Sequence, residues 1–63
     1  MKKYRVFLEI GERLHESENH ADFHSIDNSE ARILTLWRKT GEKGRKVAAA
    51  FRDWTYFLID DET

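Results

Sequence analysis

The sequence contains no cysteine, and no part of it approaches the roughly 20 consecutive apolar residues of a membrane-spanning helix. The first absence excludes a disulfide framework and a thiolate metal site, so packing, a partner or self-association must stabilise the fold. It also fits a reducing, cytoplasmic setting. The second absence predicts a soluble protein, and residues 1–17 lack the continuous apolar run of a signal peptide.

The short motifs that mark a catalytic centre are also missing. The sequence has no GxSxG elbow, no glycine-rich phosphate loop and no HExxH zinc motif. A chain of 63 residues forms one domain at most and buries only about 60% of the surface that its unfolded form exposes. Such a domain has little room for a substrate pocket. We therefore expect a single domain over residues 1–63 that is not an enzyme and has no cofactor.

Strong charge segregation lies behind the net charge of −1. Residues 11–30 hold six acids against Arg13 alone, a net charge of −5. Residues 31–52 hold seven bases against Glu42, a net charge of +6, and an acidic tail follows from Asp53. Such blocks either pair with each other inside the fold or face partners of opposite sign.

The N-terminal third predicts two strands separated by a loop. Apolar residues occupy every second position of the first strand, residues 4–10: Tyr4, Val6, Leu8 and Ile10. Phe7 is the exception, because it shares the other face with Arg5 and Glu9. Gly11 ends this strand, and the polar residues 12–20 predict a loop. A second strand is expected over residues 21–26, with Phe23 pointing inward.

The stretch DNSEARILTLWRKTG predicts a helix. Asp27 precedes Glu30 by the spacing of a capping box, and Asn28 could cap the first turn equally well. Gly41 supplies the left-handed residue that ends a helix. The apolar face of this helix would consist of Ala31, Ile33, Leu34, Leu36 and Trp37.

The last quarter, AAAFRDWTYFLIDDET, fits two structures. A helix from Arg45 would align Val47, Phe51, Trp54 and Leu58. A hairpin would instead have strands at 47–51 and 54–59 and a turn near 52–53, although no glycine is present there. The run of strand-forming residues favours the hairpin, which places Phe57 and Ile59 opposite Trp54, Tyr56 and Leu58.

The expected fold class is therefore α+β, with one helix packed on one face of a small antiparallel sheet. The element order is β-β-α-β-β, or β-β-α-β if the alanine run only leads into the last strand.

Three histidines, His15, His20 and His24, lie among carboxylates. Imidazoles and carboxylates bind zinc, and His20 and His24 would share a strand face. A structural zinc site usually needs four ligands in a tight frame, and no cysteine is available, so we expect a solvated loop and no metal. The acidic surroundings predict raised histidine pKa values.

Two groups of residues are candidates for binding. A sheet with large side chains on both faces has more aromatic surface than one helix can cover, which favours a protein partner. The residues of that group are Phe7, Glu12, Glu16, Glu18, Asp22, Trp54 and Tyr56. The alternative is a nucleic-acid surface, in which lysine and arginine side chains contact phosphates and aromatic rings stack on nucleobases. Its residues are Arg38, Lys39, Lys43, Arg45, Lys46 and Arg52, although a pI near 6.3 and acidic flanks oppose it. A structural homodimer is a third alternative.

In size and expected element order, with the segments YRVFLEI, DNSEAR and DWTYFLID, the chain resembles small inhibitors encoded by bacteriophages and mobile elements. These include anti-CRISPR proteins and phage inhibitors of host RNA polymerase. The resemblance implies a protein of the host cytoplasm that blocks a nucleic-acid-handling complex without catalysis. It also implies that acidic residues imitate phosphate, either Glu12, Glu16, Glu18 and Asp22 or Asp60, Asp61 and Glu62. The basic block departs from pure mimicry of DNA.

Overall fold

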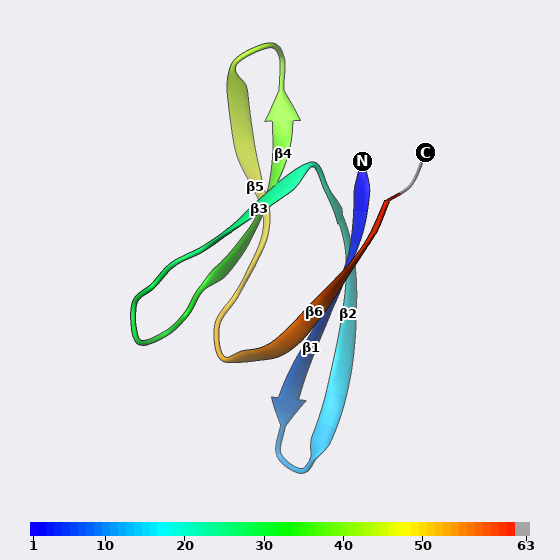
Figure 1. The fold of residues 1–63 in the computed structure, drawn as a ribbon, viewed down its shortest axis with the longest axis vertical. Coiled ribbons are helices and arrows are strands. Elements are labelled where there is room, and N and C mark those ends of the chain that lie inside the picture. Colours follow the sequence, from blue (N-terminus) through cyan, green and yellow to red (C-terminus); the bar gives the residue numbers. More distant parts are fainter. Residues whose placement is uncertain (62–63) are drawn as a thin grey trace.

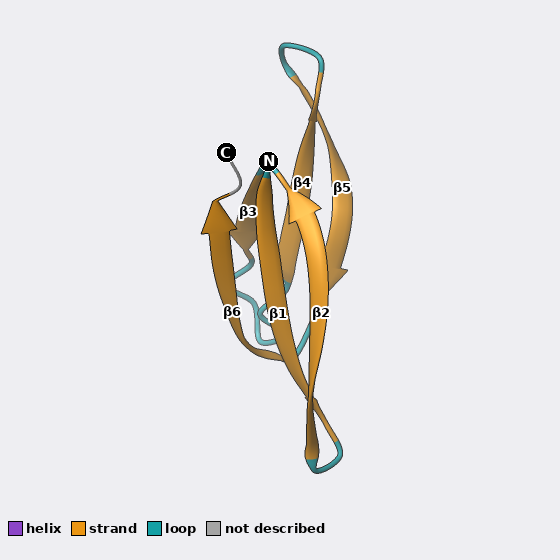
Figure 2. Cartoon of the chain, turned by 90° about the vertical axis from the view of Figure 1, so that its right-hand side faces the viewer, coloured by secondary structure: helices purple, strands orange, loops and turns teal. Residues whose placement is uncertain are grey.

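The structure is a computed structural model that describes residues 1–61, the last of them by its backbone only. Over this range the chain forms six strands and no helix. The strands are β1 (Lys2–Ile10), β2 (Arg13–Ala21), β3 (Phe23–Ile26), β4 (Leu34–Thr40), β5 (Gly44–Phe51) and β6 (Trp54–Asp61). They make two antiparallel sheets, ordered β2-β1-β6 (the first sheet) and β3-β4-β5 (the second sheet). The two sheets lie in separate layers (Figures 1 and 2).

The α+β prediction is wrong, because the segment expected to be a helix forms a turn followed by β4. Asp27 accepts a hydrogen bond from the Ser29 backbone N–H at 3.1 Å, as in a cap. The chain then closes a turn through Arg32, whose positive φ of 46° is incompatible with a continuing helix. Leu34 and Leu36 are both fully buried, so the apolar period in this segment is two.

The polar loop expected over residues 12–20 is also wrong, because this segment is β2. It pairs with β1 along its whole length, from Ile10 opposite Arg13 to Lys2 opposite Ala21. The connection has two residues, and Gly11 has the positive φ, 66°, that a type II′ hairpin turn requires at its first position. Ala21 is the only fully buried residue of β2, which explains why no apolar alternation marks this strand.

The two C-terminal strands are confirmed, but they do not pair with each other. β5 pairs with β4 and β6 pairs with β1, so residues 52–53 carry the chain between the sheets. The register of β6 shifts where Leu8 lies opposite Trp54 and Phe7 lies opposite Tyr56. This bulge turns Trp54 inward beside Phe57, so the prediction that these two rings occupy opposite faces is wrong.

The core lies between the two sheets. Its buried residues are Tyr4, Val6, Ala21, Leu34, Leu36 and Trp54, with Leu8, Ala49, Phe51 and Phe57 packed against them. Two polar contacts cross this core. The Tyr4 hydroxyl and Nδ1 of His24 are hydrogen-bonded at 2.9 Å, and Nε1 of Trp54 donates to the Arg32 carbonyl at 2.6 Å. Because the core contains residues from both sheets, each sheet is stabilised by packing against the other.

Replacing Leu36 by alanine tests this core. Leu36 is fully buried, so the substitution leaves a cavity and is expected to lower the free energy of unfolding by about 2–5 kcal/mol. The matched control is Leu58→Ala, because Leu58 is 43% exposed and should change stability much less. Urea denaturation measures both, and equal losses for the two variants would contradict the assigned core.

Candidate partner-binding face

The outer face of the first sheet is the surface that points away from the second sheet. Because Tyr4 and Val6 point inward, alternation sends the intervening side chains outward. This outer face consists of Lys3, Arg5, Phe7 and Glu9 from β1, Leu14, Glu16, Glu18 and His20 from β2, and Tyr56, Leu58 and Asp60 from β6. Figure 2 shows the first sheet toward the viewer, with no other described element in front of it.

Apolar side chains lie on this face around one stacked aromatic pair. The rings of Phe7 and Tyr56 stack with their centroids 4.4 Å apart and an interplanar angle of 16°. Leu58 lies two residues after Tyr56, on the same face of β6. Leu14 lies two residues before Glu16, on the same face of β2, and Glu16 is the residue opposite Phe7. Tyr56, Leu58 and Leu14 are 42%, 43% and 52% exposed, so these side chains meet solvent. Cross-strand aromatic pairs stabilise a sheet, but exposed ones also form binding surfaces.

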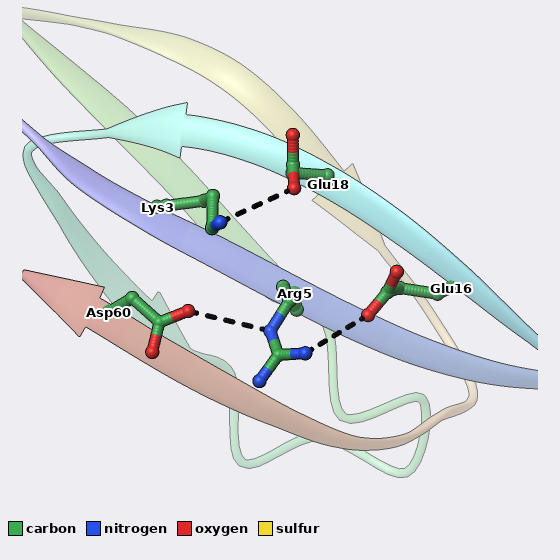
Figure 3. A network of polar contacts seen from close by, with 5 residues as sticks. All are labelled: Lys3, Arg5, Glu16, Glu18 and Asp60. Carbon is green, nitrogen blue, oxygen red and sulfur yellow. Dashed lines mark ion pairs between the residues drawn. The ribbon is translucent and has the colours of Figure 1, made fainter.

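Ion pairs lie on the same face, along β1 (Figure 3). Lys3 contacts Glu18 at 3.6 Å, and Arg5 contacts both Glu16 and Asp60 at 3.5 Å. These side chains are 30–53% exposed, so the pairs contribute little to stability. Their consequence is electrostatic: Glu16, Glu18 and Asp60, which come from the two acidic groups that the resemblance would use to imitate phosphate, each lie beside a base.

The remaining residues of the predicted protein-binding group lie elsewhere. Glu12 is exposed in the turn between β1 and β2. Asp22 is tied to β4: its carboxylate accepts from the Lys39 N–H at 2.7 Å, and its own N–H donates to the Trp37 carbonyl at 2.8 Å. Trp54 lies in the core and is 9% exposed. The structure therefore brings together Phe7, Tyr56, Glu16 and Glu18, and it separates the other three from them.

The acidic C-terminal group is only partly described. Asp60 lies on the outer face, Asp61 is placed by its backbone at the end of β6, and Glu62 lies outside the described residues. The predicted binding residues include neither Leu14 nor Leu58, although the sequence analysis placed Leu58 on the same strand face as Tyr56. Leu14 could have been found from its alternation with Glu16 and Glu18, but only by treating this polar segment as a strand.

The residues of the predicted nucleic-acid surface belong to the second sheet and its borders. Arg38, Lys39, Lys43, Arg45 and Lys46 all lie on the β4–β5 hairpin. Arg52 lies in the turn after β5, where its Nε atom is 3.9 Å from the Asp53 carboxylate.

The three histidines do not form a cluster. His15 and His20 belong to β2, and His24 belongs to β3 in the other sheet. Among the described side chains, which end at residue 60, no group of histidines and carboxylates is arranged to hold a metal ion. Burial, and to a smaller extent the charge of Lys2, lowers the pKa of His24 below its ordinary value of 6.5. The predicted increase in histidine pKa is therefore wrong for His24.

The described part of the chain contains no pocket and no helix that is long and apolar enough to cross a membrane. Comparison of the chain with protein-family models, curated proteins and solved structures finds no match. The geometry of its surfaces is therefore the basis for any assignment of function.

The lowered pKa of His24 predicts an acid-sensitive fold. The unfolded chain binds the proton more tightly than the folded chain, so stability should fall as pH drops from about 6.5 through the folded pKa. His24→Gln should remove this part of the pH dependence, whereas the control His15→Gln, at an exposed position, should retain it. Urea midpoints measured across this range check the prediction, and parallel pH profiles for wild type and His24→Gln would contradict it.

Proposed function

We propose that this chain is a non-catalytic binding protein that occupies the surface of a protein partner with the outer face of its first sheet. The observation that carries the proposal is the stacked Phe7–Tyr56 pair, which lies on an uncovered sheet face between ion-paired charges. An aromatic centre with a polar rim is the usual anatomy of a protein interface.

The charges of this face favour a protein over a nucleic acid. Lys3 and Arg5 are outnumbered by Glu9, Glu16, Glu18 and Asp60, which leaves a net charge of −2 with His20 neutral. A phosphate backbone would be repelled by this surface. The same repulsion acts between two copies of the face, so a homodimer through it is disfavoured as well.

The class of partner comes from the resemblance to phage-encoded inhibitors. The observed element order differs from the one on which that resemblance was partly based. The features that still support the resemblance are the small size of the chain and its lack of catalytic motifs. On this basis we propose a host complex that handles nucleic acid as the partner, and the cytoplasm as the site of action. The absence of cysteine supports a reducing compartment.

A double substitution of the aromatic pair tests the proposal. In Phe7→Ser/Tyr56→Ser, the loss of two interface aromatics should weaken partner binding by about 30-fold or more. The control is Ile10→Ser, which removes an apolar side chain that is 62% exposed and lies on the opposite face of β1 from Phe7. Immobilised wild type, control and double variant are compared by affinity capture from bacterial lysate with quantitative mass spectrometry.

The expected result is a protein retained by wild type and by the control but lost by the folded double variant. Circular dichroism and urea midpoints establish that this variant is folded. If the double variant captures the same proteins as wild type, the outer face of the first sheet is not the binding surface.

A further inference from the structure

A second surface, on the other sheet, has the opposite charge. Beyond Trp37, which pairs with Phe23, β4 has no partner in β3 and pairs only with β5. Residues 38–46 therefore form a two-stranded arm, named here the basic arm, which projects at the upper end of Figure 1. It contains Arg38, Lys39, Lys43, Arg45 and Lys46 against Glu42, a net charge of +4.

The bases of the arm are not neutralised within the fold. Among the side chains that the structure describes, those of residues 1–60, no ion pair joins any of these five bases to a carboxylate. Arg38 donates from Nε to the His20 carbonyl at 3.0 Å, which leaves its charge uncompensated. Lys3 and Arg5 of the first sheet, by contrast, are both in ion pairs. Five exposed and uncompensated bases on one short arm generate a positive potential that attracts a polyanion.

The fold also removes the argument from sequence against a polyanion. Of the flanking acids, Glu16, Glu18, Asp60 and Asp61 lie in β2 and β6 of the first sheet. Asp27, Glu30 and Asp53 lie in the turns next to the Leu34 and Phe51 ends of β4 and β5, at the opposite end of the hairpin from the arm. Asp22 does reach the base of the arm, but its carboxylate is engaged by the backbone N–H of Lys39. The acidic residues that adjoin the basic block in sequence therefore do not neutralise the basic arm, which keeps its net charge of +4.

An aromatic platform adjoins the arm on the outer face of the second sheet. The rings of Phe23 and Trp37 are nearly parallel, with centroids 6.4 Å apart and an interplanar angle of 15°. The guanidinium of Arg45 lies 4.3 Å from the centroid of the Trp37 ring. Nε1 of Trp37 donates to the Ser25 hydroxyl at 3.0 Å, which fixes the orientation of the indole. A bulge at Ala48 places Val47 opposite Trp37, where it extends the apolar surface.

From this combination we propose that the basic arm and the Phe23–Trp37–Arg45 platform bind single-stranded nucleic acid. Lys39 and Lys43 contact phosphates, and unpaired bases stack on the aromatic rings and the guanidinium. A duplex keeps its bases stacked inside, so it would use the charges of the arm but not the platform. This surface is separate from the Phe7–Tyr56 face, and its assignment does not depend on the proposed protein partner.

Titration with oligothymidylate tests the electrostatic part. Binding is expected at low salt, followed by quenching of tryptophan fluorescence and by the anisotropy of a labelled oligonucleotide. Each lost phosphate contact lowers the salt dependence of log K by about 0.7 for a single strand. Lys39→Gln/Lys43→Gln should therefore reduce this slope by about 1.4. The control Lys2→Gln/Arg13→Gln makes the same change in charge on the first sheet and should leave the slope unchanged.

A second variant tests the platform separately from the charges. Trp37→Leu should weaken oligothymidylate binding about tenfold or more and leave the salt slope as in wild type. Anisotropy is the readout for this variant, because the reporting indole is gone. Its far-UV circular dichroism and urea midpoint show whether the fold is retained. Ser25→Ala, which releases the indole from its hydrogen bond, should weaken binding in the same direction by a smaller factor.

Three results would overturn the proposal. One is the absence of oligothymidylate binding by folded wild type at low salt. Another is an equal reduction of the salt slope in the arm variant and in the first-sheet control. The third is equal affinity for single strands and for duplex of the same length, because the platform would then contribute nothing.

Discussion

The apolar contact between the two sheets is the interaction on which the rest of the molecule depends. A small antiparallel sheet with one apolar face must bury that face against another element to be stable. Leu34 and Leu36 from one sheet and Tyr4 and Val6 from the other provide this contact, and all four are fully buried. Since the inner faces are used for stability, both outer faces remain free to carry other chemistry.

The two outer faces differ in how their charges are arranged. On the first sheet, acids and bases alternate across neighbouring strands, and Arg5 lies between Glu16 and Asp60. On the second sheet, the bases follow one another along a single hairpin with Glu42 as the only acid of the arm. Each face also carries an aromatic pair, Phe7–Tyr56 on one and Phe23–Trp37 on the other. The fold thus places a mixed, partly acidic surface and a basic surface on different sheets, a separation that the net charge of −1 does not reveal.

The parts of the fold that sequence could predict are those with one unambiguous period. Tyr4 and Val6 alternate cleanly with Arg5 and Phe7, so β1 and both of its faces were predicted correctly. The segment 33–37 has apolar residues at spacings that satisfy a helix and a strand alike, and local capping signals favoured the wrong one. This segment forms a strand because it pairs with β3 and β5. Such pairing is non-local, so it cannot be inferred from a short stretch of sequence.

The candidate site shows the same division. Phe7 and Tyr56 were assigned to surface positions from alternation, and they lie on one face of one sheet. Trp54 was misplaced because a bulge at Thr55 adds a residue that alternation cannot anticipate. The ion pairs of Arg5 were beyond prediction, since they need the register of three strands at once.

The position of β1 between β2 and β6 has a consequence for the order of folding. Lys2 lies opposite both Ala21 and Asp61, so the middle strand of the first sheet is bordered by a near neighbour in sequence and by the far end of the described chain. The β1–β2 hairpin can form early, because its loop is short. Until β6 arrives, however, β1 keeps one hydrogen-bonding edge open and Tyr4 and Val6 lack the cover of Trp54 and Phe57. Pairing of β6 with β1, which closes a loop of most of the chain, therefore completes the core. A nascent chain that ends before β6 exposes an unpaired strand edge, which is prone to pair with another chain.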